Sequence, residues 1–590
     1  MKAIIFLLKK IKTIDPKMLL MVAVYSVMAG IMPFLWVYLP SRIITLVSEG
    51  KTDSVIPLIL VFGVVAIIFS FSISFITGNY RMRMNNIRYA LIREVIEFSL
   101  NMPFESTLDK EQLEKITSAK FSVSGPMHGA GGIILKLLNT LGLIFALIGF
   151  IWIFTTLPWY VLLLILISTG ISAYINIQLM KLIYVYWTSV IPISHKAEKL
   201  IYEFRNPLSK QDIIIYNFIG LFKSYFKKQL DLQNIALKAH QKKVQFQMVL
   251  FSTVNLVKEF GVYLWLIFAF INGQIDISRL YFLMTSMMGF LLISDGLVLN
   301  VTSIKQDVDM FNKFIELMDT KFEKDGDLIP DTVNDWEITF DDVTFNYPGK
   351  EEPVLKNVSF KINKLESLAL VGENGSGKTT IVLLLCRLFK PTSGRILLNG
   401  VDIQNLIHDE YLKYVSVIFQ DSMVLPVSIK ENITYSEDEA SGLEEVYEKS
   451  GMDKVLLDLE KSDEQTLLRI LDDDGIDLSG GQLQKLYLAR ALYKKDSKLL
   501  ILDEPTAALD ALAEGELYKS YADLTRDKAS LFISHRLAST QFCDRIIYLR
   551  NGQIIEEGTH KELIAKQGEY FTTFEIQAKH YREVEHEKLS

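Results

Sequence analysis

The sequence predicts a chain in two parts: a bundle of α-helices that crosses a membrane over residues 18–318, and a soluble α/β domain over residues 336–575. Two observations predict this division. Long stretches of the first part carry no charged residue, whereas the composition turns charged and polar after Asp319 and then alternates as strands do. Three short segments complete the expected organisation, namely an N-terminal segment 1–17, a linker 319–335 and a C-terminal tail 576–590.

The composition excludes several classes of protein. Of the 590 residues, 50% are hydrophobic and 22% are charged, and intrinsically disordered proteins lack this richness in apolar side chains. A net charge of −7 is unlike that of a nucleic-acid-binding domain, which is usually strongly basic, so no nucleic-acid partner is expected. The two cysteines, Cys386 and Cys543, are too few for a disulfide framework, and we expect both to be buried thiols.

Six membrane spans are expected from the apolar stretches of the first part. Each stretch reaches the roughly 20 residues that cross a bilayer, and one of them is about twice that length with a turn signal at Pro158, which predicts a helical hairpin. A soluble core would instead require five or more helices that are apolar on every face, which is unusual. The stretches are residues 18–40, 54–80, 137–180 (the hairpin), 244–272 and 280–301.

Charged residues interrupt the last two spans. Counted from the outer turn at 1.5 Å per residue, Lys258 lies about 21 Å deep and Asp295 about 24 Å deep. Isolated charges are costly in a bilayer, so we expect both side chains to face the interior of the bundle and either to pair or to line a cavity. The alternative is that they reach toward the inner leaflet. The role of the neighbouring Glu259 is left open.

Basic residues predict the orientation. Residues before Met18 include five lysines and one acid, and the connections 81–136 and 181–243 are rich in Lys and Arg. By the positive-inside rule these segments, and with them both termini, lie in the cytoplasm. Both connections run to roughly 60 residues with helical periodicity, far beyond ordinary loops, so we expect them to extend the membrane helices. The apolar run of the N-terminal segment is too short for a signal peptide. We expect this segment to be an amphipathic helix bound to the membrane surface.

A phosphate-binding loop opens the chemistry of the second part. Residues 372–379 read Gly-Glu-Asn-Gly-Ser-Gly-Lys-Thr, and they follow an apolar strand and precede an apolar helix. Glycines let the backbone curl so that its N–H groups face phosphate oxygens, and the helix N-terminus adds partial positive charge. In this pattern Lys378 reaches the β- and γ-phosphates, and the Thr379 hydroxyl is a ligand for Mg²⁺.

Two carboxylates lie at the end of a second apolar strand, which covers residues 498–503. Asp503 ends this strand and fits a second ligand on the magnesium side of the nucleotide. Glu504 stands next to it and is placed to polarise an attacking water. The alternative for Glu504 is an ordinary surface acid.

Residues 478–482 read Leu-Ser-Gly-Gly-Gln and precede a helical segment. With this signature, the phosphate loop and six preceding spans, the chain resembles an ATP-binding cassette (ABC) exporter of the half-transporter type. The resemblance implies ATP and Mg²⁺ as cofactors and a dimer with either a second copy or a different half-transporter. It also implies that the signature of one chain closes over ATP held by the phosphate loop of the other.

The resemblance carries roles to individual residues. Tyr347 falls where an aromatic ring stacks on adenine, Gln420 where a glutamine contacts Mg²⁺ and the attacking water, and His535 where a histidine contacts the γ-phosphate and helps to orient Glu504. The implied catalytic residues are Glu504, His535 and Gln420, and the implied metal ligands are Thr379, Gln420 and Asp503. The implied ATP-binding residues are Tyr347, Gly372, Glu373, Asn374, Gly375, Ser376, Gly377, Lys378, Thr379, Thr380, Ser479, Gly480, Gly481 and Gln482.

The function implied by the resemblance is ATP-driven export by alternating access across a cytoplasmic membrane, expected to be bacterial. Short helices near residues 102–109 and 206–212 are candidates for coupling ATP binding to the membrane helices, with plain loop turns as the alternative. The expected substrate is an amphipathic peptide, natural product or drug-like compound. Two alternatives stay open: a lipid flippase, and an ATP-gated channel or regulator without uphill transport.

Overall fold

The computed structural model describes residues 2–205, 207–322, 325–331, 336–436, 441–503, 526–534 and 541–577. The chain divides into two compact units. The first contains Met1–Met102 and Asp109–Lys321, and the second contains Pro103–Leu108 and Phe322–Ser590. The segment Pro103–Leu108 therefore belongs to the second unit, although the residues before and after it in the sequence belong to the first.

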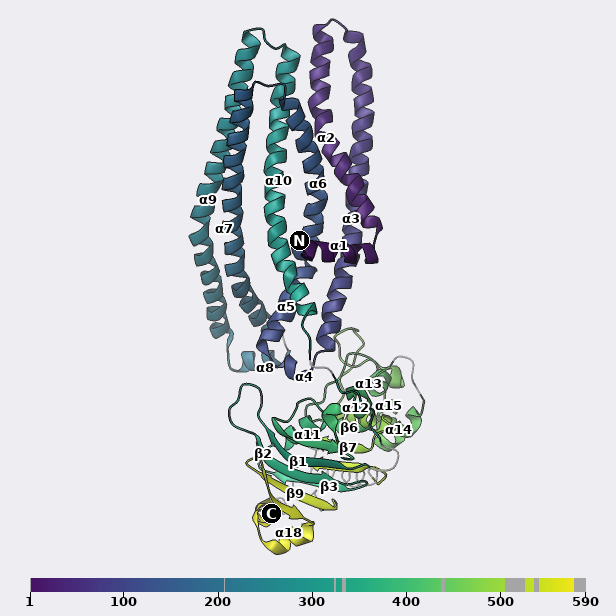
Figure 1. The fold of residues 1–590 in the computed structure, drawn as a ribbon. Coiled ribbons are helices and arrows are strands. Elements are labelled where there is room, and N and C mark those ends of the chain that lie inside the picture. The colour runs from purple at the N-terminus through teal and green to yellow at the C-terminus, as the bar shows by residue number, and fades with distance from the viewer. Residues whose placement is uncertain are drawn as a thin grey trace. The chain divides into compact units, whose positions relative to one another are not determined.

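The first unit is built of helices in its described part (Figure 1). Six of its helices are long and apolar enough to cross a membrane, which confirms the expected spans. The longest helix has 53 residues, about 80 Å at 1.5 Å per residue, against a hydrocarbon core of about 30 Å. The helices are α1 (Lys2–Ile14), α2 (Lys17–Ser48), α3 (Val55–Leu100), α5 (Lys110–Ser124), α6 (Gly129–Phe154), α7 (Trp159–Arg205), α8 (Pro207–Ile215), α9 (Ile219–Ile271) and α10 (Ile277–Met318).

One end of this unit has its own hydrophobic core, built from α1, α3, α5, α6 and α10. Phe311 and Phe314 of α10 are fully buried and stack at 5.3 Å with an interplanar angle of 8°. Beside them the buried Asp307 carboxylate accepts hydrogen bonds from Lys136 and from the backbone N–H of Gly129. The core fixes α10 shortly before it ends at Met318.

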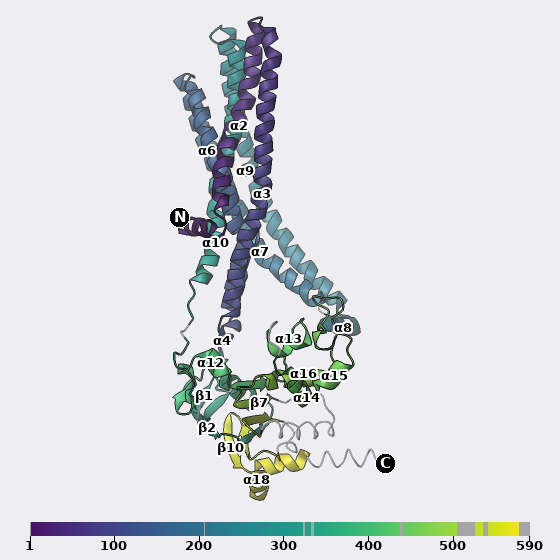
Figure 2. The same ribbon diagram turned by 90° about the vertical axis from the view of Figure 1, so that its right-hand side faces the viewer.

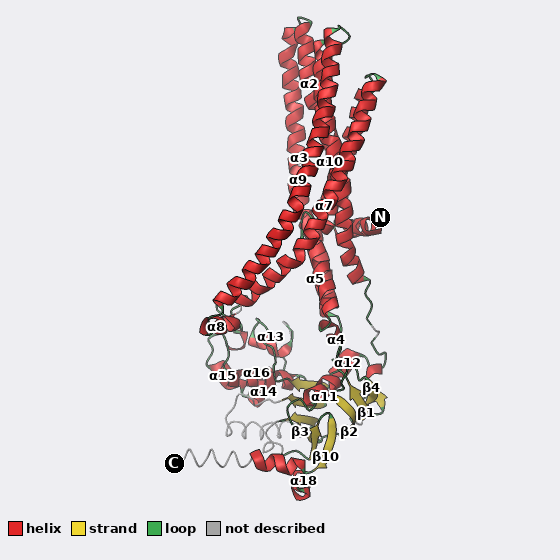
Figure 3. Cartoon of the chain, turned by 90° about the vertical axis from the view of Figure 1, so that its left-hand side faces the viewer, coloured by secondary structure: helices red, strands yellow, loops and turns green. Residues whose placement is uncertain are grey.

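The helices α7 and α9 form a separate pair over part of their length. They run side by side and diverge from the other helices toward the end that carries α8 (Figures 2 and 3). At the opposite end the Trp265 indole donates to the Tyr160 hydroxyl at 3.0 Å. Much of the diverging stretch of α9 is exposed, including Tyr225, Ile235 and Phe246.

The charged residues of the last two spans lie where α9 meets α10. The Lys258 side chain is 0% exposed, so it points into the protein, and the alternative of a lysine reaching toward the leaflet surface is wrong. The Asn255 amide donates to the Asp295 carboxylate at 2.8 Å, and the Tyr263 hydroxyl donates to Glu259 at 2.7 Å. Within the described residues the Lys258 ammonium has no hydrogen-bond partner, so of the two expected arrangements, a pair with Asp295 or the lining of a cavity, a direct pair is not formed.

The described residues of the second unit form two sheets (Figure 1). A four-stranded antiparallel sheet has the order β2-β1-β4-β5, and a six-stranded sheet has the order β10-β9-β3-β8-β7-β6. All neighbours in the larger sheet are parallel except β9 and β10. The strands are β1 (Ile338–Phe345), β2 (Leu355–Ile362), β3 (Ser367–Gly372), β4 (Ser393–Leu398), β5 (Val401–Asp402), β6 (Val415–Ile418), β7 (Leu499–Asp503), β8 (Ala529–Ile533), β9 (Arg545–Arg550) and β10 (Gln553–Gly558).

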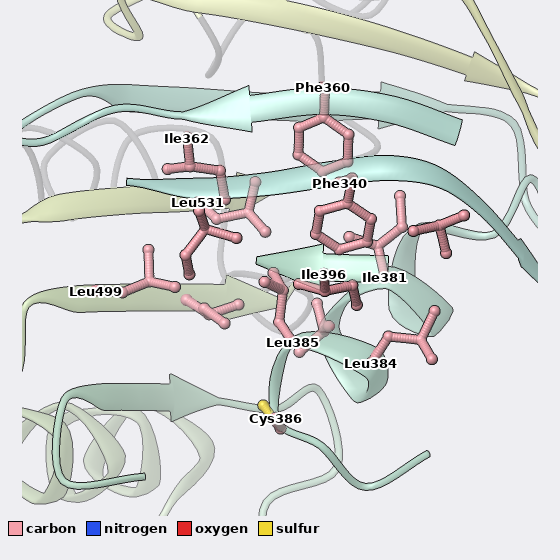
Figure 4. Packing of buried hydrophobic residues seen from close by; sticks show 14 of the residues in the cluster. Phe340, Phe360, Ile362, Ile381, Leu384, Leu385, Cys386, Ile396, Leu499 and Leu531 are labelled. Carbon is pink, nitrogen blue, oxygen red and sulfur yellow. The ribbon is translucent and has the colours of Figure 1, made fainter. Parts of the chain in front are cut away.

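The main core of this unit lies between the sheets and α11 (Lys378–Leu385). Phe340 and Phe360 stack at 4.4 Å, and Ile381, Leu384 and Leu385 of α11 pack toward the strands (Figure 4). The remaining helices are α4 (Phe104–Thr107), α12 (His408–Leu412), α13 (Ile429–Thr434), α14 (Leu443–Ser450), α15 (Met452–Leu457), α16 (Gly480–Tyr493) and α18 (His560–Lys566).

Both cysteines are buried free thiols, as predicted. Burial raises the pKa of the Cys386 thiol to about 12, and it also raises the pKa of the Cys543 thiol. Neither thiol is therefore ionised near neutral pH, and a structural role suits both.

Candidate nucleotide site

The phosphate loop connects the end of β3 to the start of α11. Gly372 ends β3 with a φ of 151°, and a Cβ at this position would lie 2.1 Å from the carbonyl oxygen of Leu549. Gly377, with a φ of 109°, precedes the first residue of α11, and a Cβ there would lie 2.5 Å from the Leu355 side chain. A side chain at either end would therefore clash with the neighbouring strand β9 or β2, so this path of the loop requires glycine at both positions.

Lys378 is held over this loop by the loop's own backbone. Its ammonium donates to the carbonyl oxygens of Gly372 and Glu373, at 3.0 Å each, and the residue is 5% exposed. Carbonyl oxygens fix the position of the ammonium without neutralising its charge. The positive charge can thus act on phosphate oxygens at the helix N-terminus, where partial positive charge already gathers.

A cavity of about 560 Å³ opens next to the loop. Among its lining residues Tyr347 and Thr380 are linked, because their hydroxyl groups lie 3.0 Å apart. The Tyr347 ring also makes an edge contact with Phe389, at 5.4 Å and 88°. The lining comprises Tyr347, Lys350, Val354, Asn374, Gly375, Gly377, Lys378, Thr379, Thr380 and Gln420, so half of the predicted ATP-binding residues meet at one place together with Gln420.

A second cavity, of about 1000 Å³, shares Thr379 and Gln420 with the first. Asp503, which ends β7 and is 1% exposed, also lines it. The structure thus brings together the three predicted metal ligands, a hydroxyl, an amide and a carboxylate. This donor set fits Mg²⁺, which prefers oxygen ligands and is typically held by one or two carboxylates together with substrate phosphates.

One basic residue of the larger cavity was not predicted. The Arg490 guanidinium of α16 donates to the carbonyl oxygens of Met423 and Asn432, at 2.9 Å each. It also lies over the Tyr487 ring, 5.6 Å from the centroid. Arg490 follows Gln482 by eight residues on the same helix. This helical spacing from the signature could have indicated Arg490 from the sequence.

Lys350 of the smaller cavity was also not predicted. It follows the turn after Tyr347, where its backbone N–H donates to the Tyr347 carbonyl oxygen at 3.0 Å. Its position close to Tyr347 in the sequence could have indicated it.

The signature residues lie elsewhere in the unit. Ser479 caps α16: its hydroxyl accepts from the Gln482 backbone N–H at 3.4 Å, and its own N–H donates to the Gln482 side chain at 2.8 Å. Ser479, Gly480 and Gly481 are exposed, and neither of the two cavities is lined by them. This chain's described residues therefore do not bring the signature to its own phosphate loop. The predicted Glu504 and His535 lie outside the described residues.

The short helix α4 contributes one aromatic ring to the larger cavity. Phe104 lines this cavity together with Gln420 and Asp503, and its ring makes an edge contact with Phe389 at 5.6 Å and 87°. A helix was expected in each of two connections, and α4 and α8 are found there.

Comparison with known proteins agrees with this site. Residues 355–507 match the family described as ABC transporter. The subtilin transport ATP-binding protein SpaT of Bacillus subtilis is 28% identical over 96% of this chain and 93% of that protein. The ATP-dependent lipid A-core flippase of Nitrosococcus oceani is 36% identical, over 42% of this chain and 41% of the flippase.

A solved structure extends the agreement to the fold of both units. The structure of a bacterial Atm1-family ABC exporter with ATP bound matches with a TM-score of 0.79, at 20% identity, over 97% of this chain and 99% of that one. Residues 355–507 therefore form an ABC transporter domain, and the chain has the fold of an ABC exporter, in which six apolar helices precede one ATP-binding domain.

Proposed function

We propose that this half-transporter exports an amphipathic peptide or a related natural product by alternating access in a dimer. The observation that carries the proposal is the pair of adjoining cavities bordered by Lys378, Thr379 and Asp503, in a chain with six membrane helices. A peptide is favoured over a lipid because the match to the protein named for transport of subtilin, a peptide, spans almost the whole chain. The flippase match covers less than half of it.

Different residues of the site bind different parts of ATP. Backbone N–H groups of the phosphate loop and the Lys378 ammonium bind the phosphates, and Tyr347 borders the same cavity as a candidate for adenine stacking. Thr379, Gln420 and Asp503 would hold Mg²⁺, which supplies positive charge to the phosphate oxygens. We assign Glu504 as the residue that polarises the attacking water and His535 as its orienting partner. Both assignments rest on the sequence.

The exposed signature supports a dimer. Ser479, Gly480 and Gly481 face solvent rather than this chain's own cavity, so we propose that they close over ATP held by a second half-transporter. The partner is a second copy or a different chain. The exposed apolar residues of α9, such as Ile235 and Phe246, are a further surface that a partner would cover.

The coupling of ATP to transport would pass through α4. Phe104 lines the cavity that also contains Gln420 and Asp503, so closure of the site around nucleotide would change the surroundings of this ring. We assign α8 the same role in the other connection. The excess of lysine and arginine in the connections supports a cytoplasmic location for them and for both termini, and we propose a bacterial cytoplasmic membrane.

The test is vectorial transport by the purified protein in sealed vesicles. A fluorescent amphipathic peptide and a fluorescent phospholipid are offered separately with ATP, and the same vesicles without ATP serve as the inactive control. ATP-dependent accumulation of the peptide against its gradient supports the proposal. Movement of the phospholipid alone would establish the flippase, and downhill flux without accumulation would establish a channel.

A further inference from the structure

The N-terminal helix α1 has two chemically different faces. Ala3, Leu7 and Ile11 form the first face and are 2%, 1% and 2% exposed. The rings of Phe311 and Phe314 on α10 lie 6.2 and 6.3 Å from the ring of Phe6. This face therefore fixes α1 to the core that surrounds the end of α10.

Ion pairs tighten the same attachment. The Lys10 ammonium lies 2.7 Å from the Glu94 carboxylate of α3. Just after α1, both oxygens of Asp15 accept from Arg83 of α3, at 2.8 and 2.6 Å. The position of α1 against α3 and α10 is thus set by apolar packing and by charge together.

The second face is basic and apolar at once. Lys2, Lys9 and Lys12 are exposed, and between them Ile5 is 50% exposed and Leu8 37% exposed. The helix contains no acidic residue, so its exposed lysines are not neutralised from within α1. In water the aliphatic side chains of this face would be exposed unfavourably, and against an apolar protein surface its lysines would be buried unfavourably. They are typical of a helix that lies in the interface of a membrane.

The surroundings place α1 at such an interface. It lies crosswise to the long helices α3 and α10 (Figure 1), and α2 begins at Lys17, immediately before the uncharged stretch 18–40. The helix is therefore at the level where the apolar span starts. On the orientation proposed above, this level is the cytoplasmic leaflet.

We propose that the exposed face of α1, formed by Lys2, Ile5, Leu8, Lys9 and Lys12, binds anionic lipids of the cytoplasmic leaflet and that this binding supports ATP hydrolysis. The lysines contact lipid phosphates, while Ile5 and Leu8 enter the acyl region. Each lysine near an anionic surface contributes about a fivefold factor in binding.

The effect reaches the ATPase through α10. Helix α1 packs against Phe311 and Phe314, shortly before α10 ends and the chain continues into the nucleotide-binding unit. A lipid that holds α1 in place therefore also holds the last turns of α10. The proposal rests on the proposed ATPase-driven transport.

The experiment compares the full-length protein in nanodiscs of phosphatidylcholine with and without phosphatidylglycerol. Native mass spectrometry counts retained phosphatidylglycerol, and ATP hydrolysis is measured on the same samples. The test variant is Lys2→Gln/Lys9→Gln/Lys12→Gln. Its matched control is Lys223→Gln/Lys227→Gln/Lys228→Gln, which removes three exposed lysines from α9. A third variant replaces the α1 lysines by arginine.

We expect phosphatidylglycerol to bind and to stimulate the wild type, the α9 control and the arginine variant. The α1 glutamine variant should lose roughly tenfold or more of its preference for phosphatidylglycerol. An α1 glutamine variant that retains and responds to phosphatidylglycerol as the wild type does would overturn the proposal. So would a wild type that ignores this lipid, in which case an acidic protein segment becomes the candidate occupant. A wild type without ATPase activity in any lipid would instead refute the proposed function.

Discussion

Two buried lysines, one in each unit, contrast sharply. Lys378 is 5% exposed and donates to two backbone carbonyl oxygens of the phosphate loop. Lys258 is 0% exposed, and among the described residues its ammonium has no hydrogen-bond partner, although Asp295 and Glu259 act on it electrostatically. The first charge is fixed by local backbone, and the second is supported only at a distance by carboxylates from two helices.

The difference teaches how each charge can be used. A lysine that neutral carbonyl oxygens hold beside the phosphate loop is placed to bind phosphate, so its loss should weaken nucleotide binding. A lysine buried near carboxylates balances charge within the protein. Its loss should therefore damage the bundle itself, because the half-buried carboxylates of Asp295 and Glu259 would lose a nearby cation.

The largest effect is expected at the residue that completes the nucleotide site. Glu504→Gln removes the carboxylate assigned to polarise water but keeps its size, so ATP should bind while hydrolysis falls by about 10²- to 10⁴-fold. Steady-state ATPase and ATP binding are measured on the same preparation. Hydrolysis at near the parent rate would show that Glu504 is not the base, and His535 or a substrate-assisted route would have to activate the water.

The next effect tests the buried lysine of the bundle. Lys258→Met keeps the length of the side chain and removes its charge, and we expect the free energy of unfolding to fall by about 1 to 3 kcal/mol. Unfolding is followed by titration with a denaturing detergent. Lys243→Met, on an exposed part of the same helix, is the control and should change little.

A second substitution sharpens this result. In Lys258→Met/Asp295→Asn the carboxylate that accepts from Asn255 is neutral as well, so part of the lost stability should return. If Lys258→Met alone is as stable as the parent, the Lys258 side chain does not balance buried charge.

The contrast between the two lysines also explains what the sequence could predict. The phosphate loop is contiguous, and its glycines and Lys378 act through the local backbone, so eight successive residues indicated both its shape and its chemistry. The six spans were predictable because length and apolarity suffice to identify them. Gln420 was placed through the family resemblance, and the structure brings it to the same cavities as Thr379.

Contacts that depend on the rotation of helices were not predictable in this way. Depth along two spans indicated that Lys258 and Asp295 lie at similar levels, yet the partner of Asp295 is Asn255, one turn away from Lys258 on α9. The pairing depends on how α9 and α10 turn their faces toward each other. The packing of Phe104 against Phe389 likewise joins residues that are far apart in sequence, and no local pattern records it.

Lys378→Ala should have a smaller effect than Glu504→Gln, and an effect no larger than that of Lys258→Met. It removes charge-assisted contacts to phosphate, each worth about 1.5 to 3 kcal/mol, so the Kd for ATP should rise about 10- to 100-fold. The fold of the second unit should persist, because the hydrogen bonds to the carbonyl oxygens of Gly372 and Glu373 join the lysine to its own loop, whereas the main core of the unit is apolar. ATP titration and thermal unfolding without nucleotide separate these effects. A large loss of stability without nucleotide would make Lys378 resemble Lys258 and remove the contrast.

The smallest expected effect concerns α4, which connects the nucleotide site to the bundle in our proposal. Phe104→Ala removes an aromatic edge contact with Phe389, a contact worth about 0.5 to 1.5 kcal/mol, so stimulation of ATPase by a transported peptide should fall about two- to tenfold. Leu108→Ala is the matched control, since Leu108 follows the same short helix and is 57% exposed. The ratio of stimulated to basal ATPase is the measurement, because a general loss of activity leaves it unchanged. Equal ratios in the two variants would mean that Phe104 packs against the nucleotide-binding unit without carrying the signal to the bundle.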